Sequence, residues 1–122
     1  MEALRRHHIS FKNAFAGLWW SFKTQPNFRV HFSLALISLL AGWYFQISYL
    51  EMAIIIFAIF FGLAMEMVNT SIEEMTDLIT TEWRKEAKIA KDVSAGMMLL
   101  SALATVIIAA LILLPRIAEK FF

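Results

Sequence analysis

Residues 51–78, EMAIIIFAIFFGLAMEMVNTSIEEMTDL, form the stretch that decides the fold. Its first part, residues 52–65, has no charged side chain, whereas carboxylates and an amide appear from Glu66 onward. Gly62 is its single glycine and proline is absent, so the pattern predicts one continuous helix. Such a helix is about 42 Å long, against about 30 Å for the hydrocarbon core of a bilayer. We therefore expect it to cross a membrane and to emerge into water at its C-terminal end.

Two further apolar stretches flank this helix. Residues 32–50 and 93–115 contain no Asp, Glu, Lys or Arg, and 60% of the whole chain is hydrophobic against 17% charged. This composition is untypical of soluble domains. We therefore predict an all-α membrane protein of one domain, in which a charged connection over residues 80–89 leads to Asp92 at the start of the last span and Pro115 ends it. The predicted spans are residues 28–47, 51–78 and 92–114.

The N-terminal region is predicted to form an amphipathic helix over residues 10–23 that lies on the membrane surface. Apolar residues recur there at helical spacing, and basic residues flank them. The aromatic side chains would sit at the acyl boundary, while the cations would meet anionic headgroups. An ordinary helix packed against a core is the alternative. Pro26 separates this helix from the first span, which Asn27 is expected to cap.

The basic residues predict how the chain is oriented. Nine of the eleven lie before or at the very start of the first span or between the second and third spans, and only Arg116 and Lys120 follow the third. Cytoplasmic loops carry an excess of lysine and arginine, so the N-terminus is expected in the cytoplasm and the C-terminus outside. The nine are Arg5, Arg6, Lys12, Lys23, Arg29, Arg84, Lys85, Lys88 and Lys91.

Polar residues form one stripe along the second predicted span. Glu66, Asn69, Thr70, Glu73 and Asp77 fall within a sector of about 100° on a helical projection. The stripe should straddle the cytoplasmic interface, where water-soluble reactants meet lipid headgroups. Its carboxylates suit a divalent cation, and the deepest, Glu66, suits a general base. Alternatives are polar contacts that only hold helices together, or the ionisable groups of a small proton-coupled transporter.

A second cluster precedes the third apolar stretch. Lys88 and Lys91 could hold phosphate oxygens, and Asp92 could cap the helix, bind a metal or orient a lysine. The small residues 94–96 fit helix packing equally well. His31, near the start of the first span, is expected to contact lipid headgroups.

Other classes of function are excluded by composition. The absence of cysteine rules out thiol chemistry, and a net charge of +1 argues against a nucleic-acid partner. The four glycines are scattered, so any phosphate site must use side chains and metal rather than a glycine-rich loop. A transporter would need polar groups at several depths, whereas the strongly polar groups of the predicted spans cluster at one interface.

Taken together, the motifs resemble the prokaryotic diacylglycerol kinase family. The resemblance is carried by Glu66-x-x-Asn69-Thr70-x-Ile72-Glu73-x-x-x-Asp77 and by Ala90-Lys91-Asp92-x-x-Ala95-Gly96. A third element, Asn27-Phe28-Arg29-Val30-His31, is more similar to the undecaprenol kinase branch. The resemblance implies transfer of phosphate from Mg²⁺-ATP to the hydroxyl of a membrane lipid, either undecaprenol or diacylglycerol. It also implies a homotrimer with shared sites in the bacterial cytoplasmic membrane.

The resemblance also implies roles for single residues. Glu66 matches the catalytic base, with Asn69 beside it as a polar active-site position, and Glu73 matches a metal-binding glutamate that also meets the nucleotide. The positions expected to contact the nucleotide are Asp77, Lys91 and Asp92, with Glu82, Trp83, Arg84 and Arg6 as further contacts.

Two departures from the family pattern stand out. Gln25 occupies the position of a second metal-binding glutamate, and Ala16 stands before Gly17 where many relatives have a basic residue. An amide oxygen can bind Mg²⁺ but brings no charge, so weaker metal binding is expected. A catalytically weakened relative that binds lipid or nucleotide is therefore an alternative. Glu66 and Glu73 are unaffected, which favours an active kinase.

Overall fold

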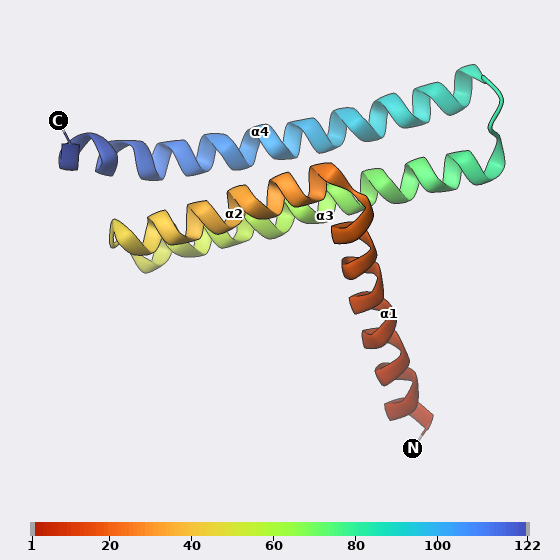
Figure 1. The fold of residues 1–122 in the computed structure, drawn as a ribbon, viewed down its shortest axis with the longest axis horizontal. Helices are drawn as coiled ribbons and strands as arrows, with labels where there is room; N and C mark the ends of the chain where they lie inside the picture. The colour runs from red at the N-terminus through yellow and green to blue at the C-terminus, as the bar shows by residue number, and fades with distance from the viewer. Residues whose placement is uncertain (1, 122) are drawn as a thin grey trace.

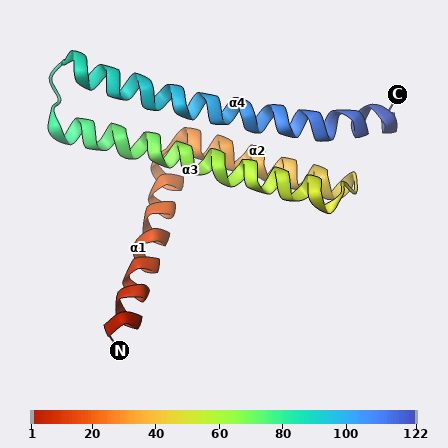
Figure 2. The ribbon, with the colours of Figure 1, turned by 180° about the vertical axis from the view of Figure 1, so that it is seen from behind.

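The computed structural model describes residues 2–121, with side chains from residue 9 onward. Within this part the chain is almost entirely helical, which confirms the all-α prediction. Figure 1 shows three helices running side by side and the N-terminal helix leaving them crosswise, and Figure 2 shows the same from behind. The helices are α1 (Glu2–Thr24), α2 (Pro26–Tyr44), α3 (Tyr49–Ile79) and α4 (Lys85–Phe121).

Helices α3 and α4 are each long and apolar enough to cross a bilayer. Helix α2 has 19 residues and a mostly apolar sequence. Its role as a further span, and therefore the three-span topology, stays a prediction.

Helix α1 is longer than the predicted 10–23, because helical backbone extends back to Glu2. Its apolar face is uncovered within the chain: Phe11, Phe15 and Trp19 are 66%, 68% and 59% exposed. Trp19 stacks on Phe22, with ring centroids 6.1 Å apart. Only at its end does this face meet another helix, where Phe22 packs edge-on against Phe32 of α2 with ring centroids 5.6 Å apart. An aromatic face so largely uncovered among the described residues suits the predicted membrane surface better than a packed core.

A single residue joins α1 to α2. Gln25 is extended, with φ −100° and ψ 108°, and Pro26 follows it as the first residue of α2. The prediction that Asn27 caps this helix is wrong, because proline has no N–H to satisfy and its fixed φ suits the first helical position. Helix α2 ends at Tyr44, earlier than the predicted residue 47, and the turn that follows contains Gln46 with φ 50°.

Helix α3 confirms the prediction of one unbroken helix through the polar stripe. It begins after Ser48, whose hydroxyl accepts the N–H of Glu51 at 3.3 Å. The Glu51 carboxylate accepts the N–H of Ser48 at 2.8 Å in return. This reciprocal capping box satisfies donors that the first helical turn would otherwise leave unpaired.

Helix α4 differs from the predicted span at both ends. It starts at Lys85, so the connection after α3 is shorter than the predicted 80–89 and Asp92 lies inside the helix. It also continues through Pro115, which was expected to end it. Proline removes the backbone hydrogen bond to the Leu111 carbonyl. The next carbonyl, that of Ile112, accepts a hydrogen bond of 2.9 Å from the Arg116 guanidinium.

Helix α3 lies at the centre of the packing, against α4 and α2. The buried cluster Ala35, Ile55, Ile59 and Leu113 draws on all three helices. Farther along, Gly62 lets α3 and α4 approach closely, because a Cβ atom there would lie 3.1 Å from the Thr105 hydroxyl. The Thr105 hydroxyl in turn lies 3.1 Å from the Ala58 carbonyl of α3.

An ion pair ties the start of α3 to the last part of α4. The Arg116 guanidinium lies 2.7 Å from the Glu51 carboxylate, and both side chains are about one-third exposed or less. Lys120, one turn later, sits 4.0 Å from the centre of the Tyr44 ring at the end of α2. These contacts fasten the three helices together at the end opposite the polar stripe.

Replacing each charged partner with glutamine should reveal how strongly this ion pair couples α3 to α4. We expect Glu51→Gln and Arg116→Gln each to lower the thermal unfolding midpoint in detergent micelles, since each leaves a half-buried charge without its partner. The double variant should lose less than the sum of the two single losses. Strictly additive losses would contradict an energetic coupling between the two side chains.

Candidate active site

The polar stripe of α3 turns its deepest members into the bundle. Glu66, Asn69 and Thr70 are only 2%, 5% and 5% exposed. Glu73 is half-buried, and Asp77 is exposed near the end of the helix. Exposure along the predicted stripe therefore increases from the buried carboxylate of Glu66 to the exposed one of Asp77. The two residues are 11 positions apart, or about 16 Å along the helix.

A hydrogen-bonded chain links this stripe to α4. The Ser94 hydroxyl, in a residue that is 1% exposed, donates to Asn69 Oδ1 at 2.8 Å. Asn69 Nδ2 donates to Glu73 Oε1 at 3.1 Å. Asn69 is thus held from both sides, and it orients the Glu73 carboxylate. Ser94 was not predicted as a site residue, because a serine among small residues is equally expected from helix packing.

Glu66 stands apart from this network. Its Oε2 atom is buried and has no hydrogen-bond partner in the part of the chain that the structure describes. A buried polar atom without a partner costs free energy. This atom is therefore positioned to accept a proton or hydrogen bond from a molecule that the chain itself does not supply.

A second feature is a pocket of about 350 Å³ where α3, the connecting loop and α4 meet. Within the described residues, each cation lining this pocket already has an acidic partner. Lys91 Nζ lies 2.5 Å from Asp77 Oδ1, and the Arg84 guanidinium lies 2.9 Å from Glu82. Lys88 pairs with Asp92 one helical turn later.

The pocket brings together nearly all residues that the sequence assigned to the nucleotide. Trp83 is 78% exposed on its loop beside them. Lys88 and the threonines of the loop are additional lining residues. The predicted residues found here are Asp77, Glu82, Trp83, Arg84, Lys91 and Asp92. Arg6 lies outside the residues whose side chains are described.

The predicted metal ligands are not gathered into a ready-made site. Nowhere between residues 9 and 121 do three or more carboxylate, imidazole or thiol side chains converge as metal ligands would. Gln25 is half-buried at the junction of α1 and α2, and its side chain makes no capping hydrogen bond. Carboxylate and amide oxygens still fit Mg²⁺, which takes few protein ligands and completes its shell with phosphates and water.

Comparison with known proteins identifies relatives of this chain. Residues 12–113 match the family described as prokaryotic diacylglycerol kinase. Undecaprenol kinase of Bacillus subtilis is 37% identical over 114 residues, which cover 93% of each chain. Diacylglycerol kinase of Synechocystis is 34% identical over 108 residues, covering 88% of this chain and 62% of that protein. The protein named diacylglycerol kinase in Helicobacter pylori strain J99 is 30% identical over 97 residues, covering 74% of this chain and 76% of the relative.

The matches extend over both the buried carboxylate and the charged pocket. Identity at this level over nearly the whole chain leaves one conclusion: the chain belongs to the prokaryotic diacylglycerol kinase family, and it is a membrane lipid kinase.

Proposed function

We propose that the protein transfers the γ-phosphate of ATP to the hydroxyl of a membrane lipid at the cytoplasmic interface. The observation that carries this proposal is the buried, unpartnered Glu66 Oε2 on the same helix face as the network that leads to the charged pocket. A lipid hydroxyl supplies the missing donor, and the pocket suits a polyanion. The lipid hydroxyl and the γ-phosphate would meet between Glu66 and the charged pocket.

Glu66 is the general base in this proposal. The acceptor oxygen forms a bond to the γ-phosphorus while the bond to the ADP oxygen breaks, and the hydroxyl proton passes to the Glu66 carboxylate. Burial of Glu66 keeps competing water away, so the lipid rather than water accepts the phosphate. Asn69 acts beside it by fixing Glu73.

The nucleotide occupies the pocket by exchange of ionic partners. Lys91 is held by Asp77 and Lys88 by Asp92. Phosphate oxygens would draw the lysines away from these carboxylates, because charge-assisted bonds to phosphate are strong. Arg84 and Arg6 are proposed as further contacts, with Glu82 and Trp83 toward the rest of the nucleotide.

Glu73 and Gln25 are the proposed ligands of Mg²⁺, which would neutralise part of the phosphate charge when bound. Asn69 holds Glu73 in place through its 3.1 Å hydrogen bond. The Gln25 side chain, which makes no capping hydrogen bond, offers an amide oxygen but no charge. Because the described part of one chain gathers too few ligands for a closed metal site, the phosphates, water or another subunit must supply the others.

The proposed assembly is a homotrimer with three spans per chain in the bacterial cytoplasmic membrane, with the N-terminus in the cytoplasm. Helix α4 supports assembly with other subunits, since only 6% of its most apolar 18-residue stretch is buried within the chain. Neighbouring subunits would cover part of that surface and close the sites. Helix α1 would lie on the cytoplasmic surface of the membrane.

Undecaprenol is the proposed acceptor, with diacylglycerol as the second candidate. The relative named for undecaprenol shares 37% identity and nearly its full length with this chain. The Synechocystis relative named for diacylglycerol is 34% identical and longer than the matched region.

Replacing the base should abolish the reaction. In bilayers supplied with Mg²⁺-ATP labelled at the γ-phosphate, we expect label to enter undecaprenol, and Glu66→Gln to reduce its rate by about 10²–10⁴-fold, as loss of a general base does. Glu74→Gln is the matched control, since that carboxylate is exposed and lies outside the polar stripe of α3. Parallel assays with diacylglycerol identify the acceptor.

Two results would count against this proposal. Equal loss in the Glu74 variant would mean that any change of charge on α3 disturbs the assembly. Full activity in the Glu66 variant would remove the proposed base and require another group to take the proton.

The proposed role of Gln25 as a metal ligand can be tested through the dependence of activity on Mg²⁺ concentration. We expect Gln25→Glu to lower the Mg²⁺ concentration for half-maximal activity by about tenfold, corresponding to about 1.4 kcal/mol of added attraction. Thr24→Glu adds the same charge one residue earlier and should leave the magnesium dependence unchanged. Identical magnesium curves for wild type and Gln25→Glu would exclude Gln25 as a metal ligand.

A further inference from the structure

The Ser94 hydroxyl has two hydrogen-bond acceptors within reach but only one hydrogen to donate. Its oxygen lies 2.8 Å from Asn69 Oδ1 on α3 and 3.0 Å from the Lys91 carbonyl of its own helix. Ser94 is 1% exposed, so bulk water is not a third acceptor. A serine hydroxyl donates one bond and can also accept. The Ser94 O–H can therefore point to Asn69 or to Lys91, but not to both at once.

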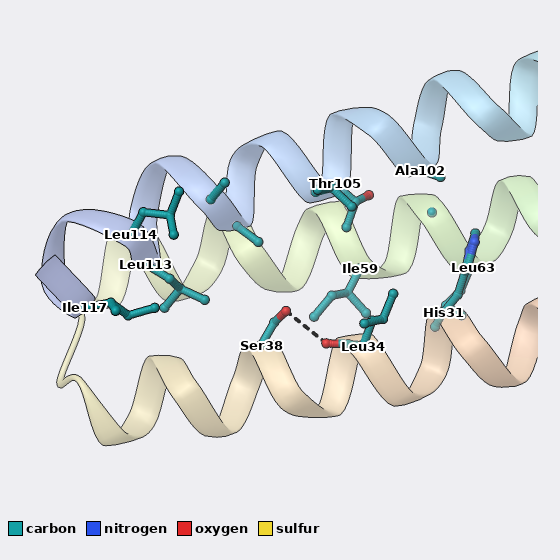
Figure 3. A pocket seen from close by; sticks show the side chains of 15 residues that line it. His31, Leu34, Ser38, Ile59, Leu63, Ala102, Thr105, Leu113, Leu114 and Ile117 are labelled. Atoms are coloured by element: carbon teal, nitrogen blue, oxygen red, sulfur yellow. Dashed lines mark hydrogen bonds between the residues drawn. The ribbon is translucent and has the colours of Figure 1, made fainter.

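Two hydroxyls in the apolar groove between α2, α3 and α4 serve as a comparison (Figure 3). The Ser38 hydroxyl donates to the Leu34 carbonyl of its own helix at 2.9 Å. The Thr105 hydroxyl lies between two acceptors, but both are backbone carbonyls held in place by their helices. At Ser94, by contrast, one of the two acceptors belongs to a side-chain amide, which can turn.

Two arrangements of the network follow from the two directions of the Ser94 O–H. In the first, which the structure shows, Ser94 donates to Asn69 Oδ1, and Asn69 Nδ2 donates to Glu73 Oε1 at 3.1 Å. In the second, Ser94 donates to the Lys91 carbonyl and the amide makes a half turn, so that Nδ2 donates to the Ser94 oxygen. This half turn moves no neighbouring atom, because the amide oxygen and nitrogen are nearly alike in size and the last torsion of asparagine is soft.

The second arrangement brings two oxygens side by side. Asn69 Oδ1 takes the place of Nδ2, which lies 3.1 Å from Glu73 Oε1. Two oxygens at this distance repel each other unless a cation binds both. In an octahedral Mg²⁺ shell with bonds of about 2.1 Å, neighbouring oxygens are about 3.0 Å apart. The pair therefore matches one edge of such a shell, and the half-buried Glu73 leaves room for water molecules to complete it.

We propose that Ser94 is a positioning residue that lets the Asn69 amide turn its oxygen toward Mg²⁺ when the cation binds Glu73. Without the cation, Ser94 holds the amide nitrogen against the carboxylate. With the cation, Asn69 Oδ1 becomes a second ligand, and the Ser94 O–H turns to the Lys91 carbonyl while its oxygen accepts the amide N–H. This inference rests on the proposed role of Glu73 as a metal ligand and adds Asn69 and Ser94 to it.

Removing the hydroxyl should weaken cation binding in the absence of nucleotide. Mn²⁺ is the probe, because carboxylate and carbonyl oxygens suit it as they suit Mg²⁺, and its free form is measured by electron paramagnetic resonance in micelles of an uncharged detergent. We expect Ser94→Ala to raise the Mn²⁺ dissociation constant by about 2–10-fold, since the turned amide loses its acceptor. Ser101→Ala is the matched control, because it removes another buried hydroxyl of α4, one that donates to the Met98 carbonyl.

An aspartate at position 69 separates positioning from packing. Aspartate has the shape of asparagine but two equivalent oxygens, so no partner is needed to set its orientation. In an Asn69→Asp background, we expect Ser94→Ala to leave the Mn²⁺ dissociation constant unchanged. An equal loss of affinity in both backgrounds would mean that Ser94 acts only through helix packing, and would overturn the proposal.

The Glu73→Gln variant distinguishes failure of this inference from failure of the metal site. We expect it to weaken Mn²⁺ binding more than Ser94→Ala does, because it removes the charge of the first ligand. Weaker binding in Glu73→Gln with no change in Ser94→Ala would overturn the role of Ser94 and leave the proposed metal ligand standing. Unchanged binding in Glu73→Gln would overturn the metal ligand itself, and this inference with it.

The wild-type protein allows a direct measurement that does not depend on the folding of a variant. The chain has three asparagines, Asn13, Asn27 and Asn69, so selective ¹⁵N labelling gives three side-chain amide signals in NMR spectra. Without Mg²⁺ we expect cross-relaxation between the Asn69 amide protons and the Glu73 side chain, and at saturating Mg²⁺ with the Ser94 side chain instead. Contact with Glu73 that persists at saturating Mg²⁺ would overturn the proposal.

Discussion

The hydrogen bond from Ser94 to Asn69 fixes how α4 lies against α3, and the rest of the site depends on it. Both residues are buried, so neither polar group can turn to water instead. With the two helices antiparallel in this register, Lys91 reaches Asp77 toward one end. Toward the other end, Thr105 meets Ala58, and Arg116 meets Glu51. A single register of α4 against α3 thus forms the polar network, the close contact at Gly62 and the terminal ion pair at the same time.

Much of this arrangement could be predicted from the sequence because it depends on local pattern. Helical period places Glu66, Asn69 and Glu73 on one face, and the apolar run before them indicates where that face enters the membrane. Pairing between helices could not be predicted, since contacts such as Ser94 with Asn69 depend on how far one helix slides along the other. The helix limits at Pro26 and Pro115 also differ from the prediction: proline suits the first turn of α2, and α4 continues through Pro115.

The site contains two different chemical environments. Toward the membrane interior, the buried Glu66 Oε2 atom has no hydrogen-bond partner among the described residues, so it can accept a hydrogen bond from a neutral hydroxyl. At the loop, every described cation in the pocket is paired with a carboxylate. An uncharged head and a polyanion therefore find different surroundings along a single helix face. Both environments are consistent with the lipid kinase family, because such an enzyme acts on a membrane lipid and on a phosphate donor.

The one-residue connection between α1 and α2 has a mechanical consequence. Two helices joined by a single extended residue can reorient only through the backbone torsions around Gln25. Any tilt of α1 on a lipid surface must therefore rotate Gln25 and displace its side chain. Lateral pressure or curvature of the bilayer, acting on the exposed aromatic face of α1, would be transmitted as torque to this position. The junction therefore couples the local state of the membrane to the geometry of a proposed metal ligand.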